Sequence, residues 1–238
     1  MSTIMITGAN RGLGLEFAKK FAENGWKVLA MCRNLNDIDE LKLISKKFDI
    51  NIFSLDVLDY SSIDECAHKL NNVSIDILLN NAGIQGSLLQ SYDKIDYEEW
   101  KKVFSTNVMS VMKVCQSFLS HVESSEKKLV VNISSGTSSI SLQNSAKSIS
   151  SSSKGELYLY RTSKTALNMV SRCMAWELMP RGVSVILLSP GSICSDLGEA
   201  KARLSLEESI NNCYTLINSW AINNTGRFYL YDGSEIPW

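Results

Sequence analysis

The sequence carries almost no net charge. Its 238 residues include 24 lysines and arginines and 25 aspartates and glutamates, so the formal charge at pH 7 is −1. Proteins that bind nucleic acid or an anionic membrane surface usually present an excess of basic residues. The composition therefore supports neither class of partner.

Long hydrophobic runs are also missing. No apolar stretch reaches the roughly 18 residues that a membrane-spanning helix needs. The first residues lead into an apolar run without the basic region or cleavage site of a secretory signal. Hydrophobic residues make up 45% of the chain, an ordinary share for a globular protein. We expect a cytoplasmic protein folded as a single domain over residues 1–238, a length compatible with one α/β domain.

Potential metal ligands are few and scattered. The six cysteines stand at positions 32, 66, 115, 173, 194 and 213, with no Cys-x-x-Cys pair and no histidine pattern beside them. The two histidines, His68 and His121, lie in stretches of helical periodicity. We predict reduced cysteines and no metal site.

Short apolar runs alternate with stretches of helical periodicity. The apolar runs predict strands at residues 3–6, 26–32, 50–55, 75–79, 129–133, 183–188 and 228–231. The periodic stretches predict helices at residues 15–22, 35–48, 60–70, 97–121, 156–178 and 204–219. This alternation indicates an α/β fold of the Rossmann-like, doubly wound kind, with one parallel sheet of about seven strands and helices on both faces.

Glycines and polar residues gather where the predicted strands end. The residues in these positions are Gly8, Gly12, Gly14, Asp56, Asn81, Ala82, Gly83, Ser135, Pro190 and Gly191. Ligands bind outside the carboxyl ends of the strands in an open parallel sheet. We therefore expect a binding site at this edge.

The first of these groups is a glycine turn with the spacing G-x-x-x-G-x-G. Glycines let the backbone approach a pyrophosphate, and a helix that begins here offers unpaired N–H groups to an anion. The turn residues assigned to a dinucleotide site are Gly8, Asn10, Arg11, Gly12, Leu13 and Gly14. A tight turn that binds nothing would have similar glycines.

The end of the second predicted strand bears on the choice between NAD and NADP. An NAD site usually places an acidic residue roughly 20 residues beyond the glycine turn, to hold the ribose 2′-hydroxyl. This sequence has Arg33 there and no acid before Asp37. Arg11 and Arg33 together could clamp a 2′-phosphate, although either one alone could be a solvated surface residue. We predict NADP, with NAD as the less favoured alternative.

Tyr160 and Lys164 stand four residues apart in a predicted helix, so their side chains share one face. A neighbouring ammonium favours the phenolate and is expected to lower the pKa of the tyrosine from its usual value of about 10. Such a pair can donate and accept a proton in catalysis. The same spacing also occurs on helix surfaces that have no function.

Taken together, these motifs resemble the classical short-chain dehydrogenase/reductase family from end to end. The resemblance rests on Thr7-Gly8-x-x-x-Gly12-Leu13-Gly14, Asn80-Asn81-Ala82-Gly83, Asn107, Ser135, Tyr160-x-x-x-Lys164 and Pro190-Gly191. The stretch from Tyr160 to Asn168 and the last eight residues are similar to the C-factor and sniffer-like carbonyl reductases. The resemblance implies an oxidoreductase that moves hydride between NADP(H) and a carbonyl or secondary alcohol.

The resemblance also implies catalytic roles for four residues. Tyr160 would be the general acid in carbonyl reduction and the base in the reverse reaction, while Lys164 would support it and hold the nicotinamide ribose. Ser135, or the adjacent Ser134, would orient the carbonyl oxygen. Asn107 would bend its helix and hold a relay water.

Further cofactor contacts follow from the same pattern. Besides Tyr160, Lys164 and the glycine turn, the family pattern assigns to the cofactor Asp56, Val57, Asn81, Ala82, Gly83, Pro190, Gly191, Ile193 and Ser195. Ser195 stands where the family often has a threonine.

The substrate is not specified by these motifs. Serine makes up more than half of residues 134–153, a composition typical of a solvated loop and equally compatible with a mobile active-site loop. This stretch makes the distance from Ser135 to Tyr160 longer than in most family members. Residues expected to line a substrate pocket are Gln85, Ile140, Leu142, Cys194 and Leu197.

Two further expectations concern partners and activity. In the family, the equivalents of the helices at 97–121 and 156–178 form a subunit interface, which implies a homo-oligomer, either a dimer or a tetramer. The alternative to an enzyme is a signalling or redox-sensing protein that binds the dinucleotide without turnover. Retention of both Tyr160 and Lys164 argues against that alternative.

Overall fold

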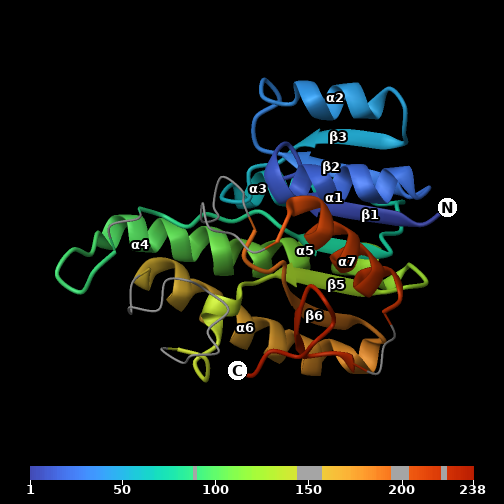
Figure 1. Ribbon diagram of the computed structural model, residues 1–238. Helices are drawn as coiled ribbons and strands as arrows, with labels where there is room; N and C mark the ends of the chain where they lie inside the picture. The colour runs from blue at the N-terminus through green and yellow to red at the C-terminus, as the bar shows by residue number, and fades with distance from the viewer. Residues whose placement is uncertain (88–89, 144–156, 194–203, 221–223) are drawn as a thin grey trace.

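The computed structural model describes residues 1–87, 90–143, 157–193, 204–220 and 224–238. Within them, all neighbouring strands of a seven-stranded sheet run parallel, in the order β3-β2-β1-β4-β5-β6-β7 (Figure 1). The strands are β1 (Thr3–Thr7), β2 (Lys27–Cys32), β3 (Ile50–Ser54), β4 (Ile77–Asn80), β5 (Leu129–Ile133), β6 (Ser184–Ser189) and β7 (Phe228–Leu230). The predicted fold class is confirmed.

The strand order reverses between β1 and β4. The chain passes from β1 outward to β2 and β3, and then returns to β4 on the opposite side of β1. Ile6 of β1 consequently pairs with Ala30 of β2 on one side and Leu79 of β4 on the other. Such a reversal opens a crevice at the carboxyl ends of the two strands, where doubly wound proteins bind their ligands.

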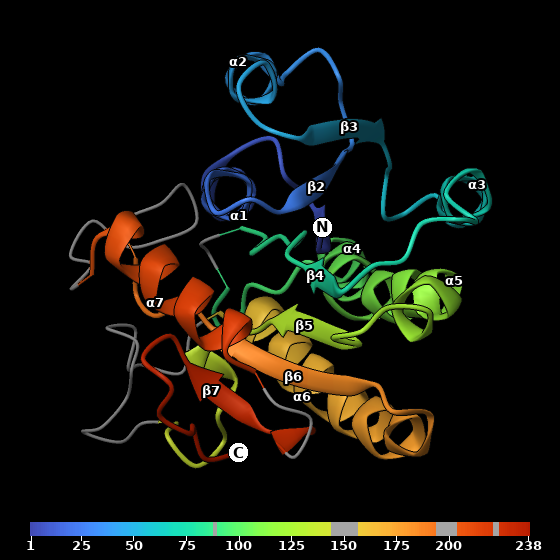
Figure 2. The ribbon, with the colours of Figure 1, turned by 90° about the vertical axis from the view of Figure 1, so that its right-hand side faces the viewer.

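Helices cover both faces of the sheet. They are α1 (Gly12–Glu23), α2 (Asp39–Ser45), α3 (Tyr60–Lys69), α4 (Tyr97–Phe104), α5 (Ser110–Glu123), α6 (Tyr158–Leu178) and α7 (Leu206–Asn218). In Figure 2, α1, α2 and α7 lie on one face of the sheet, and α3, α5 and α6 lie on the other. The two layers explain why residues of β1 and β4 are buried at every position.

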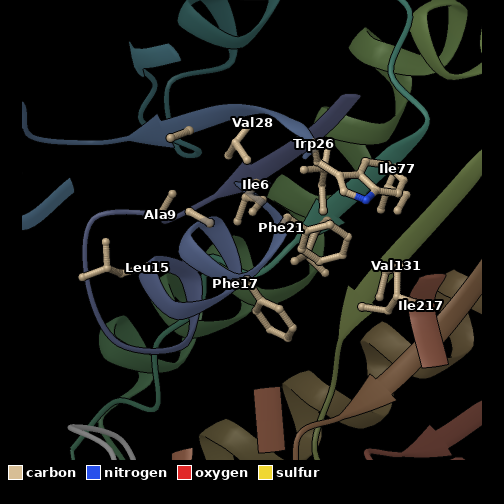
Figure 3. Close-up of a cluster of buried hydrophobic side chains, with 14 of the residues drawn as sticks. Ile6, Ala9, Leu15, Phe17, Phe21, Trp26, Val28, Ile77, Val131 and Ile217 are labelled. Atoms are coloured by element: carbon tan, nitrogen blue, oxygen red, sulfur yellow. The ribbon is translucent and has the colours of Figure 1, made fainter. Parts of the chain in front are cut away.

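The core under α1 shows how this packing is achieved (Figure 3). Phe17 and Phe21 point from α1 toward the sheet and are fully buried. The ring of Phe21 packs edge-on against Trp26, with 5.3 Å between ring centres, and against Tyr214 of α7, with 4.9 Å between ring centres. These aromatic contacts fix α1, and with it the glycine turn that precedes it, against the sheet.

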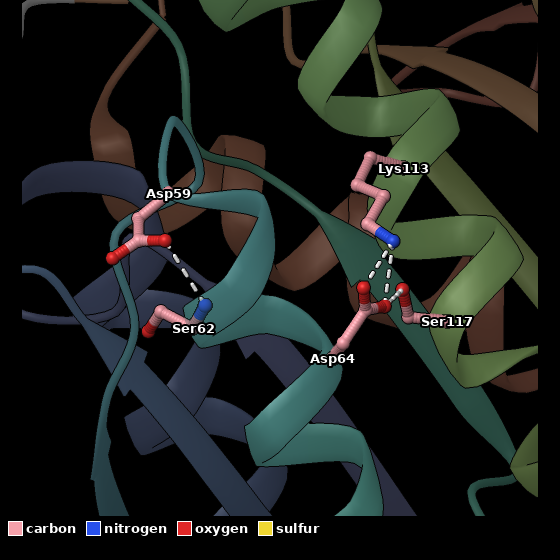
Figure 4. Close-up of polar contacts among 5 residues, drawn as sticks. All are labelled: Asp59, Ser62, Asp64, Lys113 and Ser117. Carbon is pink, nitrogen blue, oxygen red and sulfur yellow. Dashed lines mark hydrogen bonds and ion pairs between the residues drawn. The ribbon is translucent and has the colours of Figure 1, made fainter.

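On the opposite face, polar contacts tie α3 to α5 (Figure 4). Asp59 caps α3 by accepting a hydrogen bond from the N–H of Ser62 at 3.0 Å. Asp64 accepts hydrogen bonds of 2.6 Å from Lys113 and from Ser117 of α5. The Lys113 ammonium holds the pKa of the Asp64 carboxyl below its usual value. Because the cluster is exposed, its contribution to stability is small.

Two predicted helices differ from the observed ones. The helix predicted at 35–48 is reduced to α2. The Asn34 side chain accepts from the N–H of Asn36 at 2.9 Å and forms a turn before the helix, and residues 46–48 form a turn after it. The single helix predicted at 97–121 is divided by a π-helical turn, η1 (Ser105–Met109). The predicted start of α6 at residue 156 lies outside the described residues.

None of the helices in the described part of the chain combines the length and apolarity that a membrane crossing requires. No group of histidine, cysteine, aspartate and glutamate side chains there could hold a metal ion. The five cysteines among these residues are free thiols.

Candidate functional site

A cleft of about 400 Å³ opens at the carboxyl edge of the sheet. The residues predicted from the sequence that line it are Gly8, Asn10, Arg11, Gly12, Leu13, Gly14, Arg33, Asp56, Val57, Asn81, Ala82, Gly83, Ser135, Tyr160, Lys164, Pro190, Gly191 and Ile193. Gln85, expected in the substrate pocket, lines it as well. Asn107 is fully buried and does not line the cleft. Ser195, Cys194 and Leu197 fall outside the described residues.

The glycine turn closes against the end of β4. Gly8 and Gly12 adopt φ angles of +67° and +53°, in the left-handed region that glycine tolerates best. A Cβ atom on Gly14 would collide with the carbonyl oxygen of Gly8 and the side-chain amide of Asn81. That amide donates to the carbonyl oxygens of Thr7 at 2.9 Å and Gly8 at 3.1 Å. Because α1 begins here without a side-chain cap, its first N–H groups are available to an anion in the cleft.

Side chains of both charges line the cleft beyond β2. Arg33 is exposed and forms no ion pair within the described ranges. Asp37, which was not predicted to lie in the site, lines the same wall. The Asn10 side chain donates to the Asp37 carboxylate at 3.4 Å and to the backbone carbonyl oxygen of Asp37 at 3.3 Å. Arg11 reaches the cleft from the glycine turn.

Three side chains predicted to be catalytic meet at the other end of the cleft. Tyr160 occupies the first turn of α6 and Lys164 the second, so both reach the cleft from one helix face. The Ser135 hydroxyl, at the end of β5, lies beside the Tyr160 phenol and acts to lower its pKa. The Lys164 Nζ lies 5.8 Å from the centre of the Tyr160 ring and donates to the carbonyl oxygen of Ile133 at 2.8 Å.

Burial controls the protonation of this cluster. Lys164 is 5% exposed, and burial lowers its pKa from 10.5 to about 8. Burial also raises the pKa of Tyr160, and the Ser135 hydroxyl offsets only part of this rise. The net pKa of Tyr160 is therefore raised, whereas the sequence predicted that it would be lowered. The Lys164 ammonium is directed at Ile133, and desolvation of the phenol is the larger effect.

Of the two candidate serines, the geometry favours Ser135. The Ser134 hydroxyl donates to the Asn168 Oδ1 at 2.6 Å, and the side chain is buried. The Ser135 hydroxyl has Thr137 as its other neighbour, at 2.9 Å from the Thr137 Oγ1. A substrate oxygen can compete for a hydroxyl that faces the cleft, whereas the Ser134 hydroxyl is committed to helix α6.

Asn107 lies in the π-helical turn and is fully buried. Its Oδ1 accepts from the N–H of Ile84 at 2.9 Å, and its Nδ2 donates to the Ile84 carbonyl at 2.8 Å and to Ser163 Oγ at 2.9 Å. A Cβ atom on Gly83 would lie 3.2 Å from the Asn107 Oδ1 and 3.5 Å from the Lys164 Nζ. Asn107 therefore joins the α4–α5 helix to the loop after β4 and to α6.

The start of α6 depends on a residue that the sequence did not single out. Leu157 precedes the helix in a left-handed conformation, with a φ of +65°, and provides no side-chain cap. The Gln90 Oε1 instead accepts from the N–H of Leu159 at 2.8 Å. The Gln90 Nε2 donates to the carbonyl oxygens of Gln85, at 3.1 Å, and Ser87. The buried Gln90 side chain thus connects the loop after β4 to the helix turn that carries Tyr160.

Two residues predicted to line the substrate pocket do not. Ile140 is 72% exposed, and Leu142 packs against the hydrophobic cluster that includes Phe228. The backbone N–H of Ser141 donates to the carbonyl oxygen of Trp238 at 2.9 Å. The Trp238 ring stacks on Phe228, with 5.9 Å between ring centres. This contact with the C-terminal residues directs the segment away from the cleft.

Comparison with known proteins identifies relatives that match most of the chain. The family model described as short chain dehydrogenase matches residues 2–204. C-signal from Myxococcus xanthus is 30% identical over 164 residues, covering 69% of this chain and 93% of that protein. The carbonyl reductase Sniffer of D. melanogaster superposes with a TM-score of 0.88 at 25% identity and 100% coverage of both chains. The NADPH-bound carbonyl reductase from chicken fatty liver gives a TM-score of 0.86 at 27% identity, covering 100% of this chain and 94% of that one.

Proposed function

Because the chain belongs to the short-chain dehydrogenase family, we propose that it is an NADP(H)-dependent oxidoreductase. It would transfer hydride between the nicotinamide ring and a carbonyl or secondary alcohol, with Tyr160 as the general acid and base. The observation that carries the proposal is the meeting of Ser135, Tyr160 and Lys164 at one wall of the cleft. The carbonyl reductases among the structural relatives support this reaction type.

The residues at the switch point fit a dinucleotide. The glycine turn leaves no room for side chains at Gly14, and the uncapped start of α1 suits a pyrophosphate. When bound, the nicotinamide supplies or accepts the hydride. Asp56 and Val57 would flank the adenine, and the segment from Pro190 to Ile193 would contact the nicotinamide end. Every one of these residues lines the cleft.

Each polar group near the reacting carbonyl has a chemical task. The Ser135 hydroxyl donates to the carbonyl oxygen and orients it. Tyr160 delivers its phenolic proton to that oxygen as negative charge develops, and it recovers a proton when the reaction runs in reverse. Lys164 stabilises the phenolate when it carries a proton, and it would hold the nicotinamide ribose. Asn107 holds the backbone around Ile84 and would support the proton route.

The choice of cofactor rests on the end of β2. Arg11 and Arg33 favour a 2′-phosphate, because one guanidinium group can donate hydrogen bonds to two phosphate oxygens at once. Asp37 lies on the same wall and would repel that phosphate, but its carboxylate is engaged by Asn10. We infer a preference for NADP over NAD. The NADPH bound to the chicken reductase is consistent with this preference.

The rival proposal is a signalling protein that binds the dinucleotide with little turnover. The resemblance to a protein called C-signal favours it. The presence of both Tyr160 and Lys164 in the cleft favours the enzyme instead, since a binding protein needs neither a proton donor nor its neighbour. Turnover of a carbonyl panel with NADPH distinguishes the two.

Assembly, location and domain organisation extend the proposal. Exposed apolar side chains on α6, among them Met169 and Trp176, support a homo-oligomer, since large exposed apolar residues often cover subunit interfaces. The free thiols among the described residues support a reducing compartment such as the cytoplasm. The single sheet supports one catalytic domain over residues 1–238.

The decisive experiment is Tyr160→Phe, which removes the phenolic proton and leaves the ring. We expect a loss of at least about a hundredfold in kcat for NADPH-dependent carbonyl reduction, within the range for general acid catalysis. NADPH affinity, measured by fluorescence titration, should fall far less than kcat, because Tyr160 is one of many cofactor contacts. Undiminished turnover in this variant would rule out Tyr160 as the acid.

A further inference from the structure

The position of Ser135 is not set by the sheet alone. Ser135 lies between β5 and the one-turn helix η2 (Gly136–Ser138). The last backbone hydrogen bond that links this end of β5 to β6 is donated by Ser134 to Leu188, at 2.8 Å. Beyond it, the N–H of Ser138 donates to the Ser135 carbonyl oxygen at 2.9 Å, and the Ser189 hydroxyl of β6 accepts from the N–H of Gly136 at 3.0 Å.

Asn168 of α6 supplies the contacts on the helix side of this turn. Its Oδ1 accepts from the Ser134 hydroxyl at 2.6 Å, and its Nδ2 donates to the Ser138 Oγ at 2.8 Å. The Ser138 hydroxyl in turn donates to the carbonyl oxygen of Ser135 at 2.6 Å. Asn168, Ser134 and Ser138 are each at most 3% exposed. One buried amide thus connects the residue before Ser135 to the residue three positions after it.

The helical spacing places this amide on the same face of α6 as Tyr160 and Lys164. Asn168 follows Lys164 by four residues, as Lys164 follows Tyr160, so the three side chains form a row on one face of α6. We propose that Asn168 is a positioning residue that fixes the Ser135 hydroxyl against Tyr160 by clamping both sides of the serine. This inference rests on the proposed reductase function. In the proposed reaction, Asn168 touches neither the substrate nor the cofactor. It acts only through Ser135.

The first test removes the clamp and compares it with a matched loss elsewhere. Asn168→Leu removes the donor and the acceptor. Ser171→Ala is the control, because Ser171 is equally buried on α6 and accepts from Asn132 at 2.8 Å, which supports β5 but not η2. We expect Asn168→Leu to lower kcat by about ten- to a hundredfold, as a small misplacement of a catalytic group does. The KM for NADPH should stay near its wild-type value.

Ser171→Ala should lower the melting temperature to a comparable degree and leave kcat within about twofold of the wild type. Ser138→Ala, which removes the link from Asn168 to Ser135, should also lower kcat. Equal kcat values for Asn168→Leu and Ser171→Ala would overturn the proposal.

The second test uses a conservative variant with a pH signature. The carboxyl group introduced by Asn168→Asp offers both a donor and an acceptor only when protonated, and burial raises its pKa. Lys164 and Arg172 are the charged residues one turn away on α6, while β5, β6 and η2 carry none. The kcat of Asn168→Asp relative to wild type should therefore rise as the pH falls. The ratio for Asn168→Leu should stay flat, and parallel profiles for the two variants would contradict the clamp.

A third measurement needs no turnover, so it separates this inference from the proposed function. Hydrogen exchange of peptides covering residues 134–143 should be faster in Asn168→Leu than in the wild type, and unchanged in Ser171→Ala. If the wild type reduces no carbonyl, the proposed function fails while the exchange rates still decide whether Asn168 holds the turn. Unchanged exchange in Asn168→Leu would overturn the inference.

Discussion

The Lys164 Nζ donates to the carbonyl oxygen of Ile133, 2.8 Å away, from a side chain that is 5% exposed. The same amine lies 5.8 Å from the centre of the Tyr160 ring. Lys164 is therefore held by the end of β5 rather than by the tyrosine it serves.

Lys164 should make stability depend on pH. Its folded pKa of about 8 lies below the 10.5 of an ordinary lysine, so between these values the unfolded chain binds more protons than the folded one. The cost of burying the ammonium is present in full below pH 8 and is relieved as the pH rises toward 10.5. Relative to Lys164→Met, the wild type should gain at most about 3 kcal/mol of unfolding free energy over this interval. Urea unfolding of both proteins at several pH values measures it, and a constant difference would contradict the shifted pKa.

Gln90 should matter for the helix turn that carries Tyr160. Gln90→Met leaves the N–H of Leu159 and the carbonyl oxygen of Gln85 without their partner, so we expect a loss of about 1–3 kcal/mol in unfolding free energy. Gln90→Glu keeps the acceptor for the N–H of Leu159, but its second oxygen faces the carbonyl oxygens of Gln85 and Ser87 and can donate to them only when the carboxyl is protonated, so this variant should lose less stability than Gln90→Met only at low pH. Gln116→Met, on the exposed side of α5, is the control. Equal losses in the two Gln90 variants at low pH would mean that the cap on α6 contributes nothing.

Arg33 should decide the preference for NADPH over NADH. Arg33→Ala is expected to weaken NADPH binding by about ten- to a hundredfold, the effect of losing a charged hydrogen bond, and to leave NADH binding near its original level. Asp37→Asn should act in the opposite direction, because it removes a negative charge from the same wall. Fluorescence titration with both nucleotides measures the ratio. Arg181→Ala, at the amino-terminal edge of the sheet, should leave it unchanged; if Arg33→Ala does the same, the 2′-phosphate is held elsewhere.

Gly14 should tolerate no side chain. In Gly14→Ala, the added methyl group would meet the Gly8 carbonyl and the Asn81 amide and force the glycine turn open. Gly25→Ala is the control, because Gly25 has a φ of +81° but a Cβ atom there would face open space, so the substitution strains the backbone without a collision. We expect Gly25→Ala to cost about 1 kcal/mol of stability and to keep its affinity for the dinucleotide. Gly14→Ala should lose that affinity; retention would show that the turn does not cradle the pyrophosphate.

Local patterns in the sequence were sufficient for the fold and for the residues at strand ends. The apolar runs identify β1 to β7, and the glycines and Pro190-Gly191 lie where those strands stop. The shortened α2 was missed because the Asn34 side chain competes with the helix for a backbone N–H. That competition is visible in the sequence only as an excess of asparagine.

Contacts between distant positions were beyond such patterns. Gln90 reaches Leu159 and Asn168 reaches Ser134 across long stretches of chain, and neither residue has a distinctive neighbourhood in the sequence. The direction of the Tyr160 pKa was missed for a related reason. Spacing shows that Lys164 is near, but only the packed structure shows how much water the phenol has lost.

The hydrogen bond from Ser141 to Trp238 has a practical consequence for anyone who handles this protein. The backbone that follows the serine of the cleft is anchored to Trp238. A fusion partner, affinity tag or surface linker placed at Trp238 would disturb that anchor. For activity screening or immobilisation, the attachment should be made away from this residue.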